Sequence, residues 1–218
     1  RMYAAMANWL SWLPGGLMHS NIGACTVFAA TSGSSVATAA TVGTVSLPLI
    51  ERYGYNERLF LGTLAAGGTL GILIPPSINM IIYAVLTDTS IPRLYLAGII
   101  PGLGMALLFM ALVFGLCLLR PAWGGRRPPT SWSQRIASLP SLLPPIGIFL
   151  VVVGSIYAGL ATPTEAASLG VVAALGLAWA YGKLSIRMLK EVFESAMRTT
   201  AMVMLIIVAA YFLNFVIS

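Results

Sequence analysis

Charge is scarce in this chain. Only 8% of its 218 residues are Asp, Glu, Lys or Arg, and it has a single histidine and two cysteines. A soluble domain carries charge on roughly one quarter of its residues, so the composition excludes an ordinary soluble globular fold. Hydrophobic residues instead make up 58% of the chain, and the mean hydropathy is +0.91. The sequence therefore predicts a polytopic membrane protein.

The apolar residues fall into uncharged stretches that suit membrane-spanning helices. A spanning helix needs ~20 mostly apolar residues, and stretches of about this length or longer occupy 59–87, 94–119, 136–164, 166–182 and 199–218. A further uncharged stretch covers residues 2–50 but has a polar centre. We expect an all-α polytopic membrane fold.

The few cations give a net charge of +6, which by itself could indicate nucleic-acid binding. They cluster at the ends of the apolar stretches rather than along a soluble face, so membrane topology explains them better and no nucleic-acid partner is expected. Cytoplasmic loops are enriched in Lys and Arg. We therefore place two loops in the cytoplasm, one with Arg120, Arg126, Arg127 and Arg135, the other with Lys183, Arg187, Lys190 and Arg198.

Several catalytic and metal-binding patterns are missing. Cys25 and Cys117 form no CxxC pair and have no paired histidine, so neither a disulfide framework nor a metal site is indicated. No phosphate loop, HExxH sequence or plausible Ser/His/Asp set is present. The pattern favours a membrane protein that is not an enzyme. The single histidine, His19, is expected at a wet membrane interface.

A double proline interrupts the stretch 59–87 at Pro75-Pro76. Proline has no backbone N–H, so the carbonyls of Gly71 and Ile72 lose their helical partners, and Ile74 is pushed towards an extended conformation. Unpaired carbonyls in hydrocarbon are destabilising by several kcal/mol (order of magnitude) unless protein, water or an ion satisfies them. Such a break predicts a cavity or a binding site and is typical of secondary transporters.

The segment 16–50 has the pattern of two short helices around a polar tip. Small apolar residues occupy 17–31 and 36–47, and Ser32-Gly33-Ser34-Ser35 separates them. Neither arm is long enough to span a bilayer, and serine and glycine favour turns over helix continuation. We predict a re-entrant hairpin with its tip at 32–35. Small residues also mark plain helix crossings, but the double proline nearby favours the hairpin.

The tip and the break together could bind a cation. The first arm ends in unpaired carbonyls and the second begins with unpaired N–H groups. Serine hydroxyls and the carbonyls near Gly71 and Ile74 would form an all-oxygen shell, which hard cations prefer. We assign Ser32, Ser34, Gly71 and Ile74 to a coupling cation; sodium fits, and lithium or protons are also compatible.

An anionic substrate is expected near the same place. The start of a helix attracts anions, so Ser35 and Thr38 are candidates to face the substrate, together with Ser77 and Asn79 beyond the break. Asn79 fits an interhelical hydrogen bond equally well.

Glu165 is the only acidic residue between residues 94 and 190, which could indicate proton relay. The sequence Thr162-Pro163-Thr164-Glu165 has the spacing of a helix capping box. We favour this structural role.

Four segments also resemble a known family. PGGLMHSNIGACTVFAATSGSSVATAATVGTVSLP, RYGYNERLFLGTLAAGGTLGILIPPSINMIIYA, SIPRLYLAGIIPGLGMAL and ATPTEAASLGV resemble, in order, the large permease (DctM-type) subunit of tripartite ATP-independent periplasmic (TRAP) transporters. The resemblance implies a multi-pass protein of the bacterial inner membrane. It also implies sodium-coupled import of small organic acids, such as C4-dicarboxylates, sialic acid or 2-oxo acids, with a small membrane subunit and a periplasmic binding protein.

The family's large subunit has two inverted repeats and works as an elevator. By the resemblance, the first sodium site maps onto Ser32, Gly33, Ser34, Gly71, Ile74 and Pro76. We expect this chain to be a segment of a longer protein that holds the first repeat and the start of the second. Two alternatives remain: a divalent-anion/sodium symporter without a binding protein, and a channel or non-transporting membrane scaffold.

The expected organisation follows from these patterns. It comprises a scaffold or interfacial helix end (1–15), the hairpin (16–50), the broken helix and the following span (51–119), a cytoplasmic linker (120–135), two further spans (136–182), and a connecting helix with the start of the second repeat (183–218). A second sodium site and the rest of the substrate pocket would lie outside the chain.

Overall fold

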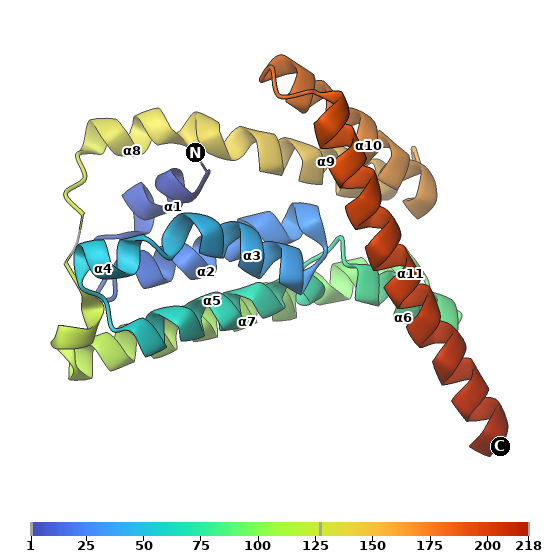
Figure 1. Ribbon diagram of the computed structural model, residues 1–218, viewed down its shortest axis with the longest axis horizontal. Helices are drawn as coiled ribbons and strands as arrows, with labels where there is room; N and C mark the ends of the chain where they lie inside the picture. Colours follow the sequence, from blue (N-terminus) through green and yellow to red (C-terminus); the bar gives the residue numbers. More distant parts are fainter. Residues whose placement is uncertain (1, 127, 218) are drawn as a thin grey trace. The chain divides into compact units, whose positions relative to one another are not determined.

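The computed structural model describes residues 2–126 and 128–217, and every regular element within them is helical (Figure 1). Four of these helices are long and apolar enough to cross a membrane, or five if one bent pair counts as a single span. This confirms the prediction of an all-α, multi-pass membrane protein. The chain divides into two compact units, residues 1–171 and 172–218, which are described separately.

The first unit begins with a group of helices that holds the predicted hairpin and broken helix. Its elements are α1 (Met2–Leu10), α2 (Leu17–Ser32), α3 (Ser35–Ser46), α4 (Leu49–Tyr53), α5 (Glu57–Leu73), α6 (Ile78–Leu86) and α7 (Ile91–Leu119). After a 3-10 turn, η1 (Pro121–Gly124), the chain continues through α8 (Trp132–Ser138), the 3-10 turn η2 (Leu139–Leu142), α9 (Leu143–Tyr157) and α10 (Pro163–Ala180).

The core of this unit lies where α2 packs against α1, α5 and α7 and where α3 packs against α5 (Figure 1). Close approach depends on glycines of α5. A methyl group on Gly67 would lie 3.0 Å from the Cys25 Sγ, and one on Gly68 would lie 2.8 Å from the Cβ of Ala39. Small residues therefore bring the backbones together, as in other membrane helix pairs.

Tyr55 and its neighbours in sequence join three segments at one end of the unit. Its buried hydroxyl accepts a hydrogen bond from the N–H of Leu17 at 2.9 Å, so it caps the start of α2 from another part of the chain. Nearby, the N–H of Asn56 donates to the Trp123 carbonyl at 3.3 Å, and the N–H of Arg126 donates to the Tyr53 carbonyl at 2.7 Å. These bonds hold the segment 120–126 against the start of α5.

Within the predicted linker 120–135, η1 occupies Pro121–Gly124 and α8 begins at Trp132. Ser131 caps it, and its side chain accepts from the N–H of Gln134 at 3.2 Å. α8, η2 and α9 follow one another without a gap and form one span candidate, Trp132–Tyr157. Arg127 lies outside the described residues.

The capping box before α10 is confirmed. The N–H of Thr162 donates to the Glu165 carboxylate at 2.8 Å, and the N–H of Glu165 donates to the Thr162 hydroxyl at 3.4 Å. This carboxylate therefore closes the first turn of a helix.

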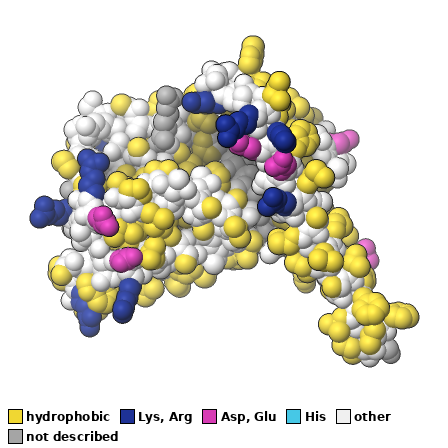
Figure 2. Space-filling view, viewed as in Figure 1, with side chains coloured by type: hydrophobic (Ala, Val, Ile, Leu, Met, Phe, Trp, Pro, Cys, Tyr) yellow, Lys and Arg dark blue, Asp and Glu magenta, His cyan; other side chains and the backbone are white. Residues whose placement is uncertain are grey.

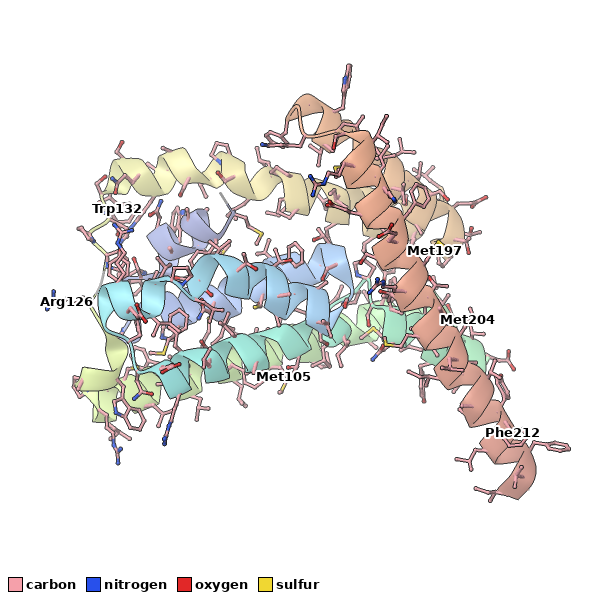
Figure 3. The ribbon with its side chains drawn as sticks, viewed as in Figure 1. Met105, Arg126, Trp132, Met197, Met204 and Phe212 are labelled. Carbon is pink, nitrogen blue, oxygen red and sulfur yellow. The ribbon has the colours of Figure 1, made fainter. Side chains whose placement is uncertain are left out.

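The second unit consists of the end of α10 and α11 (Ile186–Ile217). Ser185 caps α11 by accepting from the N–H of Met188 at 3.1 Å. The connecting helix and the start of the second repeat were expected within 183–218. There the structure has one continuous helix, Ile186–Ile217, which includes Met197, Met204 and Phe212 (Figure 3).

The prediction for His19 is wrong. The His19 side chain, on α2, is only 1% exposed, and its Nε2 lies 2.8 Å from the Pro14 carbonyl oxygen. The preceding turn brings the Pro14 carbonyl to the imidazole, which the sequence pattern did not reveal.

Candidate cation and substrate site

The predicted hairpin tip is formed by residues 32–35. α2 ends because Gly33 adopts a left-handed conformation (φ 61°), and its N–H donates to the Ala29 carbonyl at 3.2 Å. Ser34 is extended (φ −134°), and its hydroxyl accepts from the N–H of Ala37 at 3.4 Å, which caps α3. The two helices pack against each other, so the segment is a helical hairpin (Figure 1).

The predicted break at Pro75-Pro76 is also present. α5 ends at Leu73, Ile74 is extended (φ −87°, ψ 123°) as expected for a residue before proline, and the Pro75-Pro76 peptide bond is cis. Ser77 then caps α6 and accepts from the N–H of Met80 at 3.5 Å. The two helices bend by 42° across the break.

One expected free carbonyl is already paired. The Ser77 hydroxyl donates to the Ile72 carbonyl at 2.7 Å, so the prediction that Ile72 leaves an open acceptor is wrong. A side chain beyond the break replaces the N–H that Pro76 lacks. For Gly71, no donor to the carbonyl oxygen is found within residues 2–126 and 128–217, so the acceptor expected there is open.

The hairpin tip and the break lie against each other. The N–H of Ile78 donates to the Gly33 carbonyl at 3.4 Å. A methyl group on Gly33 would come within 2.7 Å of the Pro76 carbonyl oxygen, and one on Gly71 within 2.6 Å of the Ser34 carbonyl oxygen. Two interruptions about forty residues apart in sequence therefore form one junction, in which two glycines allow backbone oxygens to approach.

A group of hydroxyls stiffens the tip. The hydroxyl of Thr38 donates to the Ser34 carbonyl at 2.7 Å and lies 2.8 Å from the hydroxyl of Ser32. Thr38 is fully buried. The three residues hold one another in place, so the tip is pre-organised rather than loose.

All six residues assigned to sodium lie at this junction. Gly33, Gly71 and Ile74 are buried, and Ser32, Ser34 and Pro76 are half-buried. The groups gathered there are backbone carbonyls and hydroxyls, which suit a hard cation with oxygen ligands. The open acceptor of Gly71 is the feature that best fits such a ligand.

The four candidate substrate residues divide into two pairs. Thr38 and Ser77 are fully buried, and their hydroxyls are engaged within the protein. Ser35 is half-buried and Asn79 is exposed. The amide of Asn79 makes no hydrogen bond with the rest of the described chain, so Ser35 and Asn79 are the pair with polar groups accessible from outside.

A buried polar chain beside the hairpin was missed. The hydroxyl of Tyr3 donates to Asn21 Oδ1 at 2.8 Å, Asn21 Nδ2 donates to the Thr63 hydroxyl at 3.1 Å, and that hydroxyl donates to the Phe60 carbonyl at 2.7 Å. It links α1, α2 and α5. The signal in the sequence was an isolated asparagine in the apolar arm 17–31.

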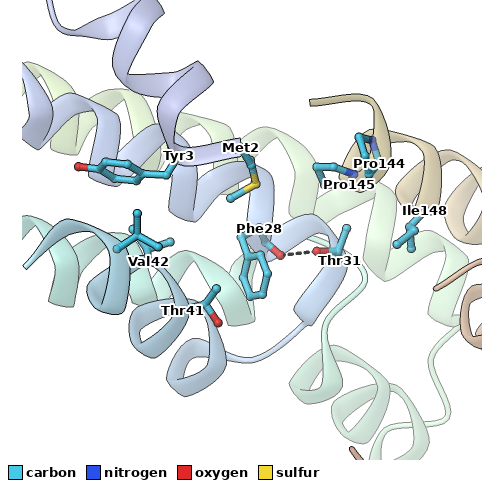
Figure 4. Close-up of a pocket in the computed structure, with 10 residues that line it drawn as sticks. Met2, Tyr3, Phe28, Thr31, Thr41, Val42, Pro144, Pro145 and Ile148 are labelled. Atoms are coloured by element: carbon cyan, nitrogen blue, oxygen red, sulfur yellow. Dashed lines mark hydrogen bonds between the residues drawn. The ribbon is translucent and has the colours of Figure 1, made fainter. Parts of the chain in front are cut away.

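A cavity of about 350 Å³ lies beside the arms of the hairpin rather than at its tip (Figure 4). Met2 and Tyr3 of α1, Phe28 and Val42 of the hairpin, and Pro144 of α9 are among its lining residues. Its walls are mostly apolar and contain no residue assigned to the cation or the substrate. The cavity is therefore separate from the junction.

Taken together, the geometry defines the class: a multi-pass membrane protein in which a helical hairpin packs by its tip on a broken helix. The whole chain, residues 1–218, matches the family model described as "Tripartite ATP-independent periplasmic transporter, DctM component". The chain belongs to this family, as the four segments predicted.

Relatives named for different substrates match the chain. It is 37% identical over 199 residues to a C4-dicarboxylate TRAP transporter large permease protein of Pseudomonas aeruginosa, covering 90% of this chain and 46% of the relative. It is 34% identical over its whole length to an ectoine/5-hydroxyectoine large permease protein of Ruegeria pomeroyi, 51% of which is covered. A sialic acid TRAP transporter permease protein of Haemophilus influenzae is 32% identical, with 100% of this chain and 35% of the relative covered. The chain thus spans about half the length, or less, of the curated relatives it matches.

Proposed function

We propose that this chain forms the first cation-binding half of the large permease subunit of a sodium-coupled TRAP transporter. The subunit would import a small organic acid and would catalyse no chemical reaction. The observation that carries the proposal is the contact between the hairpin tip and the broken helix, where Ile78 N–H meets the Gly33 carbonyl at 3.4 Å.

The junction supports a sodium site through its backbone. Carbonyls of Gly33, Ser34, Gly71 and Pro76 lie at or next to the contact, and the Gly71 oxygen has no donor within the described residues. A cation held between these oxygens would stabilise the packing of the tip on the break, so binding would favour the closed junction. The hydroxyl of Ser32, which lies 2.8 Å from the Thr38 hydroxyl, would add one further oxygen.

Coupling to substrate follows from the same arrangement. The start of α3 lies directly after the tip, and its unpaired N–H groups would attract a carboxylate near Ser35. Asn79 follows on the far side of the break. A substrate anion bound between them would meet a tip already ordered by sodium, and each ligand would therefore strengthen binding of the other.

The remaining features of the proposal come from membership of the family. The hairpin would be re-entrant, the transport domain would move as an elevator in the bacterial inner membrane, and a small membrane subunit and a periplasmic binding protein would be partners. The names of the relatives differ in substrate, so we propose a small carboxylate-bearing compound and no single molecule.

Reconstitution of the complete permease with its small subunit tests the function. Proteoliposomes would receive the purified binding protein and radiolabelled succinate, ectoine or sialic acid. Uptake of one of these should require both the binding protein and an inward sodium gradient, and a potassium gradient should not replace it. Sodium-driven uptake without a binding protein would indicate an independent symporter, and flux indifferent to both would overturn the proposal.

A further inference from the structure

Arginines gather at one end of the first unit, where α5 begins and α7 ends, and Figure 2 shows Lys and Arg side chains at the left of the view with carboxylates among them. Arg58 lies in the first turn of α5 and Arg120 directly follows α7; both are exposed. The ion pairs found among the described residues are Arg187–Glu191 and Lys190–Glu194. Arg58 and Arg120 therefore form no ion pair with a carboxylate among the described residues.

The two arginines share a hollow of about 710 Å³. Its lining is Asn56, Glu57, Arg58, Leu59, Arg120 and Trp123. The walls are held in place, because Asn56 N–H donates to the Trp123 carbonyl at 3.3 Å and the Arg120 guanidinium lies 4.6 Å from the Trp123 ring centroid. The side chains come from both α5 and the end of α7, so the tertiary structure creates the hollow.

The hollow lies directly beyond the end of a candidate membrane span. α7 is an apolar span candidate that ends at Leu119, and the arginine follows at once. Just before it, α7 leaves apolar side chains uncovered: Leu112 is 59% exposed, Leu118 56% and Leu119 81%. Tryptophan and arginine are typical of the interface between hydrocarbon and headgroups. A ligand that fits this site is anionic at one end and apolar at the other.

We propose that this hollow binds the headgroup of an anionic phospholipid such as phosphatidylglycerol. The phosphodiester lies between the guanidinium groups of Arg58 and Arg120, and the acyl chains lie along the uncovered leucines of α7. Two arginines and the Glu57 carboxylate leave one net positive charge in the lining, which matches a single phosphodiester. Basic pockets between membrane helices are known to hold such headgroups.

The test uses the complete permease purified in neutral detergent. Its thermal midpoint is measured while phosphatidylglycerol or phosphatidylcholine is added in mixed micelles. Phosphatidylglycerol should raise the midpoint and phosphatidylcholine should not. Arg58→Gln with Arg120→Gln should weaken the apparent affinity for phosphatidylglycerol by about tenfold or more, because both cations that face the phosphodiester are removed. Arg93→Gln with Lys183→Gln removes the same charge elsewhere and should leave the affinity unchanged.

Two further measurements keep the proposal open to refutation if the double variant folds poorly. A photoreactive phosphatidylglycerol should label the wild-type segment 108–126 in preference to the start of α7. Inorganic phosphate at the same concentration should not raise the midpoint, because it lacks acyl chains. Equal stabilisation by inorganic phosphate would identify a plain anion site, and equal stabilisation by phosphatidylcholine, an equal effect of the control variant or labelling elsewhere would each overturn the proposal.

Discussion

The N–H of Ile78, the first residue of α6, donates a hydrogen bond to the carbonyl of Gly33, the residue that ends α2, at 3.4 Å. This bond joins the two places where the helices of the first unit are interrupted. Each interruption supplies what the other lacks, since one presents a carbonyl after its helix has ended and the other an N–H before its helix has begun. The fold thereby buries two polar breaks against each other.

Gly33→Ala should disrupt this contact. The residue has φ 61°, and its new methyl group would lie 2.7 Å from the Pro76 carbonyl oxygen. The left-handed conformation alone is destabilising by about 1–2 kcal/mol for alanine, and the clash adds to it. We expect a loss of about 2 kcal/mol or more in the free energy of unfolding of the complete permease, measured by denaturation in detergent.

Gly43→Ala is the matched control for Gly33→Ala. It lies in α3 of the same hairpin, and a methyl group there would have no atom within 4 Å. Alanine favours the helix over glycine by up to about 1 kcal/mol, so this variant should be as stable as the wild type or more stable. Equal losses in both variants would contradict the junction.

Gly71→Ala should disturb the same junction and with it the proposed cation site. Its methyl group would lie 2.6 Å from the Ser34 carbonyl oxygen and 2.8 Å from the Thr38 hydroxyl, so it would wedge the tip away from α5. We expect the sodium concentration for half-maximal uptake to rise at least about tenfold, equivalent to about 1.4 kcal/mol.

The control for Gly71→Ala is Gly62→Ala, on the same helix with nothing within 4 Å of the added methyl group. Its sodium dependence should equal that of the wild type. An unchanged sodium requirement in correctly folded Gly71→Ala would separate the cation from this junction.

Ser77→Ala should destabilise the break. It removes the donor to the Ile72 carbonyl and the cap of α6 in one step. Losing a cap is destabilising by about 1 kcal/mol and an unpaired buried acceptor by about 1–3 kcal/mol, so we expect a fall of about 2–3 kcal/mol in the free energy of unfolding. Thr69→Ala, which removes an exposed hydroxyl on α5, should change it by less than about 0.5 kcal/mol. Similar stability of the two variants would argue against the role of Ser77.

Tyr3→Phe should loosen α1 from the hairpin. Asn21 Oδ1 would lose its donor while remaining fully buried, which is destabilising by about 1–2 kcal/mol. Hydrogen exchange of α1 amides should increase accordingly. Tyr83→Phe, at a tyrosine that is 58% exposed, serves as the control and should leave the exchange unchanged.

Local chemistry made several features predictable. Ile74 is extended because it precedes proline, Gly33 turns left-handed because it lacks a side chain, and Thr162 with Glu165 forms a capping box. Each depends on residues within a few positions of one another, so the sequence pattern contains the cause.

Other features depended on distant residues and were missed. His19 is buried and pairs with the Pro14 carbonyl, and the pairing of Asn21 needs partners on two other helices. The hydroxyl that donates to the Ile72 carbonyl belongs to Ser77, on the other side of the break. Hydrophobic periodicity and helix propensity do not predict such contacts, because they describe one segment at a time.

The prolines show which structural features the sequence alone does not determine. By itself the sequence determined an apolar, helical, membrane-embedded chain of the TRAP permease family, and two places where its helices could be interrupted. Pro101 nevertheless lies inside the continuous α7, and Pro144-Pro145 begins α9 rather than breaking it, since the first turn needs no N–H donors. Only the tertiary structure brought the tip at Gly33 onto the break at Pro76, because packing of α2 and α3 on the glycines of α5 fixes the positions of the two interruptions relative to each other.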